Sequence, residues 1–285
     1  MVMLNVIRKE YHKAVCSELI SYREDSDALS FIDEATAMSG ELTRQMISKL
    51  SCAIGTRKLP PDTIGQRFAE LTRTFIGQSL SVLGRPIIGE WIVSTTGVHM
   101  AVDAFGRHTT VADVQRVLVA DPRLRIELNH YCVIAPDIIV ARRVHHRDLT
   151  SLGPELACEE RNIQPGTVSH RDAIYNYLLH AVISCHWTVR GPPDERRSVD
   201  VLNLFHNRRG STPHIMAVTF EPLPARLASL ALGTGDLDCM YHVALHELLE
   251  AIDEVGSSDH KEAIQSLVQG RRLRDISDLP LDLAV

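Results

Sequence analysis

Residues 183–190 have the sequence Ile-Ser-Cys-His-Trp-Thr-Val-Arg, in which an apolar run gives way to polar residues. A charged loop with two prolines, Gly-Pro-Pro-Asp-Glu-Arg-Arg at 191–197, follows directly. Upstream, the apolar run Val-Ile-Ala-Pro-Asp-Ile-Ile-Val at 133–140 carries one acid, Asp137. Downstream, Asp200 begins another patterned segment. These segments place acids, a histidine and arginines beside two apolar strands.

The composition is that of an ordinary globular protein. The 285 residues are 45% hydrophobic and 23% charged, so the chain can bury a large core, and we expect one domain over residues 1–285. The net charge of -6 gives no general sign of nucleic-acid binding. Arginine, which binds phosphate and guanine bidentately, outnumbers lysine 25 to 5. Genome composition is by itself a sufficient explanation of that excess.

The cysteines and the apolar runs limit the cellular setting. The six cysteines are scattered without a Cys-x-x-Cys pair, which argues against a zinc ribbon or a redox motif and fits free thiols in a reducing cytoplasm. The N-terminus has no signal-peptide core. No apolar run approaches the roughly 18 residues of a membrane span. We therefore expect a cytoplasmic protein with no membrane association.

The periodicity of apolar residues predicts an α/β protein with a helical N-terminal part. Helical spacing and capping residues predict helices over residues 4–22, 28–51, 63–83, 110–120, 195–208, 224–231, 237–254 and 258–269. Apolar runs predict a buried strand ending near 190, a strand over 214–220 and paired or kinked strands over 131–142. Residues 86–93 fit either the end of a helix or a strand. Residues 145–171 are predicted to form a long polar connection, and residues 279–285 a loosely held tail.

Three acids are candidates for a metal site. Asp137 precedes a buried strand, where an acid is costly unless it binds a cation or is otherwise paired. Mg²⁺ prefers oxygen ligands and can activate water for phosphodiester hydrolysis. Asp200 and Glu70, each on a predicted helix, could add carboxylates. An exposed turn acid explains Asp137 about equally well, and a solvated helix face explains Asp200.

Ser184, Cys185 and His186 lie at the end of the strand before the charged loop. A backbone carbonyl there can complete a metal shell, and His186 could activate water or bind a phosphate oxygen. The alternative is a histidine at the edge of the core whose ring is already hydrogen-bonded.

The charged loop contains candidate DNA-reading residues. Arginine donates to guanine O6 and N7, and aspartate accepts from cytosine N4. Arg190, Asp194 and Arg196 could therefore contact neighbouring G·C pairs in the major groove. Without the neighbouring acids, a solvated salt-bridged loop would be the better explanation.

A separate pair, His242 and His246, suggests a zinc hydrolase as a third hypothesis. Zinc uses histidines four residues apart on one helix face. The order His-x-x-x-His-Glu differs from the zincin order His-Glu-x-x-His, which favours a structural amphipathic helix.

Taken together, the motifs resemble type II restriction endonucleases of the NgoMIV type, a CCGG-core group of the PD-(D/E)XK-like nuclease superfamily. The similarity is clear over roughly 130–250 and also includes the segments at 202–204, 207–210, 213–215 and 231–239. The family has a Pro-Asp pair, a gap of nearly fifty residues, a lysine, thirteen residues and an acid. Here 48 residues separate Asp137 from His186, and 13 separate His186 from Asp200.

The resemblance implies a restriction-endonuclease-like core, with a small mixed central sheet flanked by helices, and Mg²⁺-dependent cleavage of double-stranded DNA. The site would be a GC-rich palindrome with a CCGG core, similar to GCCGGC. A homodimer or homotetramer and a partner DNA methyltransferase in the same restriction system are also implied. Asp137 and the Cys185 carbonyl would bind the metal. The catalytic set would be Asp137, His186, Asp200, Glu70 and Ser184, and the DNA-binding set Arg190, Asp194 and Arg196.

Three departures from the family pattern keep two hypotheses open. His186 occupies the lysine position, Asp200 occupies a glutamate position, and the recognition loop is two residues longer. A neutral imidazole carries no fixed charge to stabilise a pentacovalent phosphate. The first hypothesis is an active endonuclease. The second is a sequence-specific DNA-binding protein of the same fold with lost or weak cleavage.

Overall fold

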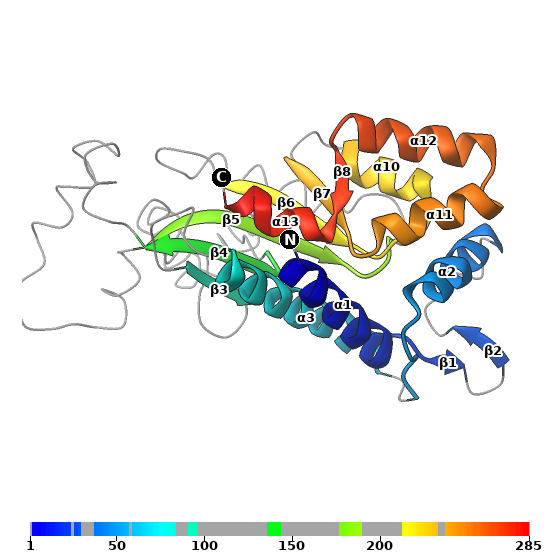
Figure 1. The fold of residues 1–285 in the computed structure, drawn as a ribbon, viewed down its shortest axis with the longest axis horizontal. Helices are drawn as coiled ribbons and strands as arrows, with labels where there is room; N and C mark the ends of the chain where they lie inside the picture. Colours follow the sequence, from blue (N-terminus) through cyan, green and yellow to red (C-terminus); the bar gives the residue numbers. More distant parts are fainter. Residues whose placement is uncertain are drawn as a thin grey trace, which may run out of the picture. The chain divides into compact units, whose positions relative to one another are not determined.

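The computed structural model, drawn as a ribbon in Figure 1, divides into two compact units. The structure describes residues 2–23, 26–29, 37–56, 59–83, 91–95, 136–143, 177–189, 213–232 and 237–284. The first unit comprises Met1–Pro86, Ile183–Asp194 and Ile215–Val285, and the second comprises Ile87–Val182 and Glu195–His214.

The described strands form a six-stranded mixed sheet whose strand order follows the chain. In order these strands are β3 (Trp91–Thr95), β4 (Ile138–Arg143), β5 (Tyr177–His186), β6 (His214–Thr219), β7 (Cys239–His242) and β8 (Leu273–Asp275). β3 and β4 are antiparallel, whereas β6, β7 and β8 run parallel. Strands buried on both faces have continuous apolar runs, as β6 and β7 do. A separate ribbon pairs β1 (Tyr22–Arg23) with β2 (Ser26–Leu29).

Two long helices, α1 (Val2–Leu19) and α3 (Pro61–Val82), lie side by side in the first unit (Figure 1). Tyr11 joins them, because its hydroxyl lies 2.7 Å from Thr72 Oγ1 and its ring centroid lies 4.9 Å from that of Phe75. α3 begins with a proline, which suits the first helical position because no backbone N–H is needed there. Gly55 passes so close to the end of α1 that a Cβ would lie 2.0 Å from Ser17 O.

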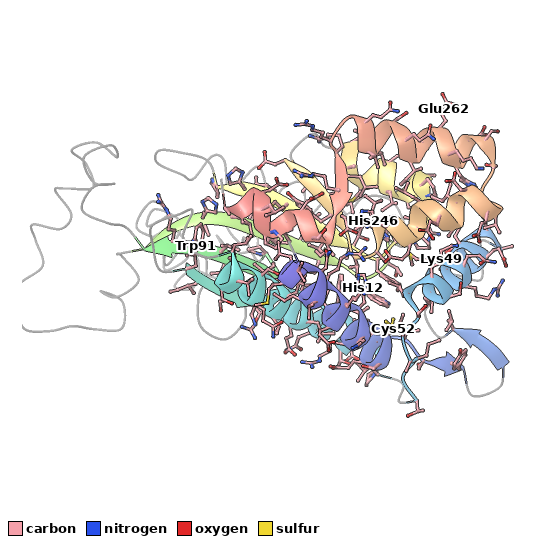
Figure 2. The ribbon with its side chains drawn as sticks, in the orientation of Figure 1. His12, Lys49, Cys52, Trp91, His246 and Glu262 are labelled. Carbon is pink, nitrogen blue, oxygen red and sulfur yellow. The ribbon has the colours of Figure 1, made fainter. Side chains whose placement is uncertain are left out.

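Shorter helices complete the first unit. They are α2 (Ala37–Leu50), α10 (Pro224–Leu232), α11 (Leu245–Val255), α12 (Ser258–Gln269) and α13 (Leu279–Leu283), with a 3-10 turn η4 (Ile276–Asp278). α11 turns an apolar stripe inward, and Lys49 at the end of α2 binds Glu254 of α11 at 2.6 Å (Figure 2). No helix in the described part of the chain is long and apolar enough to cross a membrane.

The predicted class is confirmed: the fold is α/β, with a mixed sheet, flanking helices and a helical N-terminal part. The predicted helices near 4–22, 63–83, 224–231 and 258–269 are present, and so are the strands ending near 190 and over 214–220. Of the two alternatives for 86–93, the described residues form a strand, which pairs with β4. The elements predicted at 110–120, 145–171 and 195–208 lie outside the described residues.

Three predictions were wrong. The helix expected over 237–254 is instead the buried strand β7 followed by α11, because a short apolar run does not distinguish a buried strand from a helix. The helix expected from residue 28 begins at Ala37, and Ser26–Leu29 pairs with β1. The expected loose tail is α13, in which Leu279 and Leu283 are fully buried.

Candidate functional site

Asp137 lies at a bend directly before β4 in the second unit. Its side chain is half-buried, and the next four residues, 138–141, are completely buried. The carboxylate therefore sits where the chain enters the core. This is a position at which a hard oxygen donor can serve a divalent cation.

Ser184 and His186 lie at the end of β5, and their side chains share one face because successive strand residues alternate. His186 Nε2 lies 3.2 Å from Ser184 Oγ, and Ser184 Oγ donates to Met216 O at 3.5 Å. This hydrogen-bond chain places a proton on Nε2, because Ser184 Oγ donates its own hydrogen to Met216 O and so accepts from the imidazole. His186 is only 6% exposed, and its carbonyl accepts a hydrogen bond from Phe220 N at 3.3 Å. Ser184 and His186 thus form a part-buried pair that can hold or pass a proton.

Cys185 presents its side chain to the opposite face of β5. The thiol is buried and is not part of a disulfide. Burial raises the pKa of the Tyr11 hydroxyl, and negative charge on Cys185 would raise it further. Since the thiol faces away from Ser184 and His186, only the Cys185 backbone carbonyl can belong to a site on their face of the strand.

Trp187 and Glu221 hold the chain where it leaves β5. The Trp187 ring stacks on Phe220 with centroids 4.8 Å apart and planes 2° apart, and it meets Phe68 edge-on at 5.3 Å. Glu221 is fully buried and accepts a hydrogen bond from Val189 N at 2.8 Å. Sequence reasoning missed Glu221, although the rule that selected Asp137 applies to it: an acid beside a buried strand needs a partner.

Glu70 lies on α3 and is engaged by an arginine. Its carboxylate accepts from Arg67 Nη1 at 2.7 Å, and Arg67 Nε also binds Glu18 of α1 at 2.6 Å. Glu70 is two residues from Phe68, the residue that meets Trp187, and so points to a different side of the helix. A role for Glu70 in the site remains a prediction.

The zinc hypothesis is contradicted by the positions of its two histidines. His246, labelled in Figure 2, is an exposed residue near the start of α11, whereas His242 ends β7, so the two histidines do not share a helix face. His242 Nε2 donates to Glu221 O at 3.1 Å, and its Nδ1 accepts from Ala244 N at 3.0 Å. Burial lowers the pKa of His242 to about 4, and both ring nitrogens are already in use. The described residues include no group of three or more potential metal ligands of the His, Cys, Asp or Glu type.

The remaining candidates, Arg190, Asp194, Arg196 and Asp200, lie outside the described residues. Val189, the residue before the recognition loop, is described and has its N–H bound to Glu221. The structure therefore describes where the loop starts on the first unit.

Comparison with known proteins identifies the family. A family model described as NgoMIV restriction enzyme matches residues 11–285. The chain is 31% identical over 289 residues to the type II restriction enzyme NgoMIV of Neisseria gonorrhoeae, covering 98% of this chain and 97% of that relative. A solved complex of restriction endonuclease PspGI with substrate DNA is 13% identical, covers 98% of this chain and 91% of its own, and has a TM-score of 0.26. The resemblance inferred from the motifs is confirmed by the first two matches: the chain belongs to the NgoMIV restriction enzyme family and is a type II site-specific deoxyribonuclease.

Proposed function

We propose that this restriction endonuclease uses Mg²⁺ to cut double-stranded DNA at a GC-rich palindrome with a CCGG core, similar to GCCGGC. The observation that carries the proposal is the spacing of Asp137, His186 and Asp200, which reproduces the family pattern in a chain that matches the family model throughout this region. The position of Asp137 at the edge of a buried strand and the hydrogen bond between the part-buried Ser184 and the buried His186 are compatible with that role.

The donors available in the chain suit a hard cation. The Asp137 carboxylate and the Cys185 carbonyl are oxygen ligands of the type that Mg²⁺ prefers, and Asp200 and Glu70 would add further carboxylates. A bound ion would stabilise charge on the scissile phosphate and favour an attacking hydroxide. In this proposal, Nδ1 of His186 takes the proton of the attacking water or, once protonated, donates a hydrogen bond towards the phosphate, while Nε2 keeps its hydrogen bond to Ser184. Ser184 fixes the orientation of the imidazole through its hydroxyl.

The site's partners follow from the symmetry of its substrate. A palindrome has twofold symmetry, so a homodimer, or a homotetramer built from two dimers, would present one Arg190–Asp194–Arg196 loop to each half-site. We further propose that a DNA methyltransferase of the same restriction system protects the cell's own sites. The enzyme would work in the cytoplasm, where the four free cysteines among the described residues can stay reduced.

Digestion of a plasmid of known sequence, with Mg²⁺ and separately with Mn²⁺, followed by sequencing of the ends, tests the proposal. Discrete fragments that end at one CCGG-containing palindrome are expected. Discrete cutting at a different palindrome would refute the specificity. No cutting in either metal, with tight binding to CCGG duplexes, would instead support the alternative: a DNA-binding protein in which His186 no longer sustains cleavage.

Replacing Arg190 with alanine is expected to weaken specific binding by about 1–3 kcal/mol and to relax discrimination at one G·C pair. The reason is the loss of a bidentate contact to guanine O6 and N7. Cleavage rates on the palindrome and on its single-base-pair variants measure the effect. Arg44→Ala, which removes an exposed arginine paired with Glu41, is the matched control. Unchanged discrimination in Arg190→Ala would exclude Arg190 as a guanine-binding residue.

His186→Lys is expected to raise the cleavage rate about tenfold at neutral to mildly alkaline pH, because a lysine ammonium places positive charge beside the developing phosphate charge. Single-turnover cleavage measures the rate of the chemical step. His186→Gln, which is neutral and of similar size, is the control and is expected to gain nothing. A slower His186→Lys enzyme with an unchanged melting temperature would show that the site is adapted to histidine.

A further inference from the structure

Glu221 is a fully buried carboxylate with both oxygens occupied. Oε2 accepts a hydrogen bond from Val189 N at 2.8 Å, and Oε1 accepts one from Leu223 N at 3.1 Å. Arg226 Nη1 lies 3.7 Å from Oε1 and balances the charge. Burying a carboxylate is costly, and hydrogen bonds to a charged acceptor are stronger than neutral ones. The carboxylate therefore ties the segment after β6 to the segment that leaves β5.

The segment leaving β5 is fixed at three successive points by two neighbouring residues. Phe220 N donates to His186 O at 3.3 Å, and the Phe220 ring stacks on Trp187. Glu221 then binds Val189 N. His186 is a proposed catalytic residue and Arg190 a proposed guanine reader. The contacts to Phe220 and Glu221 thus span the whole interval between the two proposed roles.

We infer that Glu221 is a positioning residue for DNA specificity, which holds Val189 so that Arg190 starts from a fixed point. This inference rests on the proposed function, because it takes Arg190 to be a residue that binds guanine. Consecutive Cα atoms are about 3.8 Å apart, so a displacement of Val189 is passed directly to Arg190. A bidentate arginine–guanine contact tolerates little displacement, because both hydrogen bonds need nearly linear geometry.

Glu221→Gln tests the inference with little change in size. The amide keeps one acceptor oxygen but places an NH₂ donor against one of the two backbone N–H donors, and it removes the charge opposite Arg226. The measurement is the ratio of cleavage rates on the GCCGGC-type site and on sites altered at one core base pair. We expect this ratio to fall roughly tenfold, comparable to the loss of one hydrogen bond to a charged group.

The ratio separates positioning from stability. A variant that is only less stable has fewer folded molecules, which slows cleavage of both sites equally and leaves the ratio unchanged. Glu247→Gln is the matched control, because Glu247 is a partly buried glutamate paired with an arginine, Arg8, as the fully buried Glu221 is paired with Arg226. It is expected to lower the melting temperature without changing the ratio.

The outcomes distinguish the inference about Glu221 from the proposed function. If Arg190→Ala loses discrimination while Glu221→Gln keeps the wild-type ratio, the inference about Glu221 is wrong and the proposed function stands. If Arg190→Ala also discriminates normally, the proposed recognition loop is itself wrong. Should Glu221→Gln fail to fold, Glu221→Asp replaces it: the charge is kept, but the shorter side chain cannot reach both Val189 N and Leu223 N. A wild-type ratio in Glu221→Asp would likewise overturn the inference.

Discussion

Asp137→Ala is expected to abolish DNA cleavage while specific DNA binding persists. Loss of a metal-binding carboxylate removes several kcal/mol of transition-state stabilisation, so we expect a fall of roughly 10³-fold or more. Binding is expected to persist because it is assigned to other residues, Arg190, Asp194 and Arg196. Single-turnover cleavage and a binding titration of the same duplex, both in Mg²⁺, measure the two effects separately.

Asp238 provides a matched control for Asp137. Each aspartate lies at a bend directly before a strand, and Asp238, whose Oδ2 accepts a hydrogen bond from Ile215 N at 2.7 Å, is outside the proposed catalytic set. Asp238→Ala is expected to lower the melting temperature and to leave the cleavage rate per folded molecule unchanged. Wild-type cleavage by Asp137→Ala would remove Asp137 from the catalytic set, and the metal site would have to be sought elsewhere.

The parts of the fold that the sequence predicted are those with one unambiguous period. α3 has an apolar stripe at helical spacing and a proline start, and both its existence and its bounds were predicted within two residues. The prediction at β7 was wrong for the opposite reason. Its four residues are all buried, so its sequence does not alternate between apolar and polar residues as a half-exposed strand does. The helical pattern of α11 follows closely, and the predicted helix was therefore begun too early, at residue 237. The pairing that makes Cys239–His242 a strand comes from β6 and β8, which are distant in sequence.

The candidate site was predicted only in its residue types and spacing. Alternation along β5 was sufficient to place Ser184 and His186 on one face, and their hydrogen bond follows from that placement. The partners of Glu221 could not be predicted, because Val189 and Glu221 are 32 residues apart and only tertiary packing brings them together. Similarly, the spacing of His242 and His246 fitted a helix, but a strand end between them separates the two side chains.

Replacing Arg8 with methionine is expected to destabilise the first unit by about 3–5 kcal/mol. Arg8 is 12% exposed and donates two hydrogen bonds to Asp275 and two to Glu247, at 2.7–2.9 Å. These contacts join α1 to β8 and α11. Methionine fills a similar volume but leaves two carboxylates, one of them almost completely buried, without their shared cation. Chemical denaturation at neutral pH measures the loss of stability.

The loss of stability in Arg8→Met is expected to depend on pH. Burial alone would raise the pKa of Asp275 and of Glu247, but the hydrogen bonds and charge of Arg8 outweigh it and hold both pKa values below the ordinary range. A depressed pKa contributes stability above the unfolded-state pKa, which is about 4 for these groups, and that stability is lost as pH falls further through the folded-state pKa. In Arg8→Met the largest interactions that oppose burial are lost, although Ser277 still donates hydrogen bonds to Asp275, so both carboxyls take up protons more readily in the folded state. The difference in stability between wild type and variant should therefore be largest near neutral pH and shrink as the solution is acidified.

An exposed ion pair supplies the contrast. Lys13 binds Glu10 at 2.6 Å, but both side chains are more than half exposed, and water screens their attraction. Lys13→Met should consequently leave the unfolding free energy and its pH dependence close to those of the wild type. If Arg8→Met behaved in the same way, the cluster of Arg8, Glu247 and Asp275 would contribute little net stability. The junction of α1 with β8 and α11 would then depend on apolar packing, since favourable pairing would do no more than offset the cost of burying the charges.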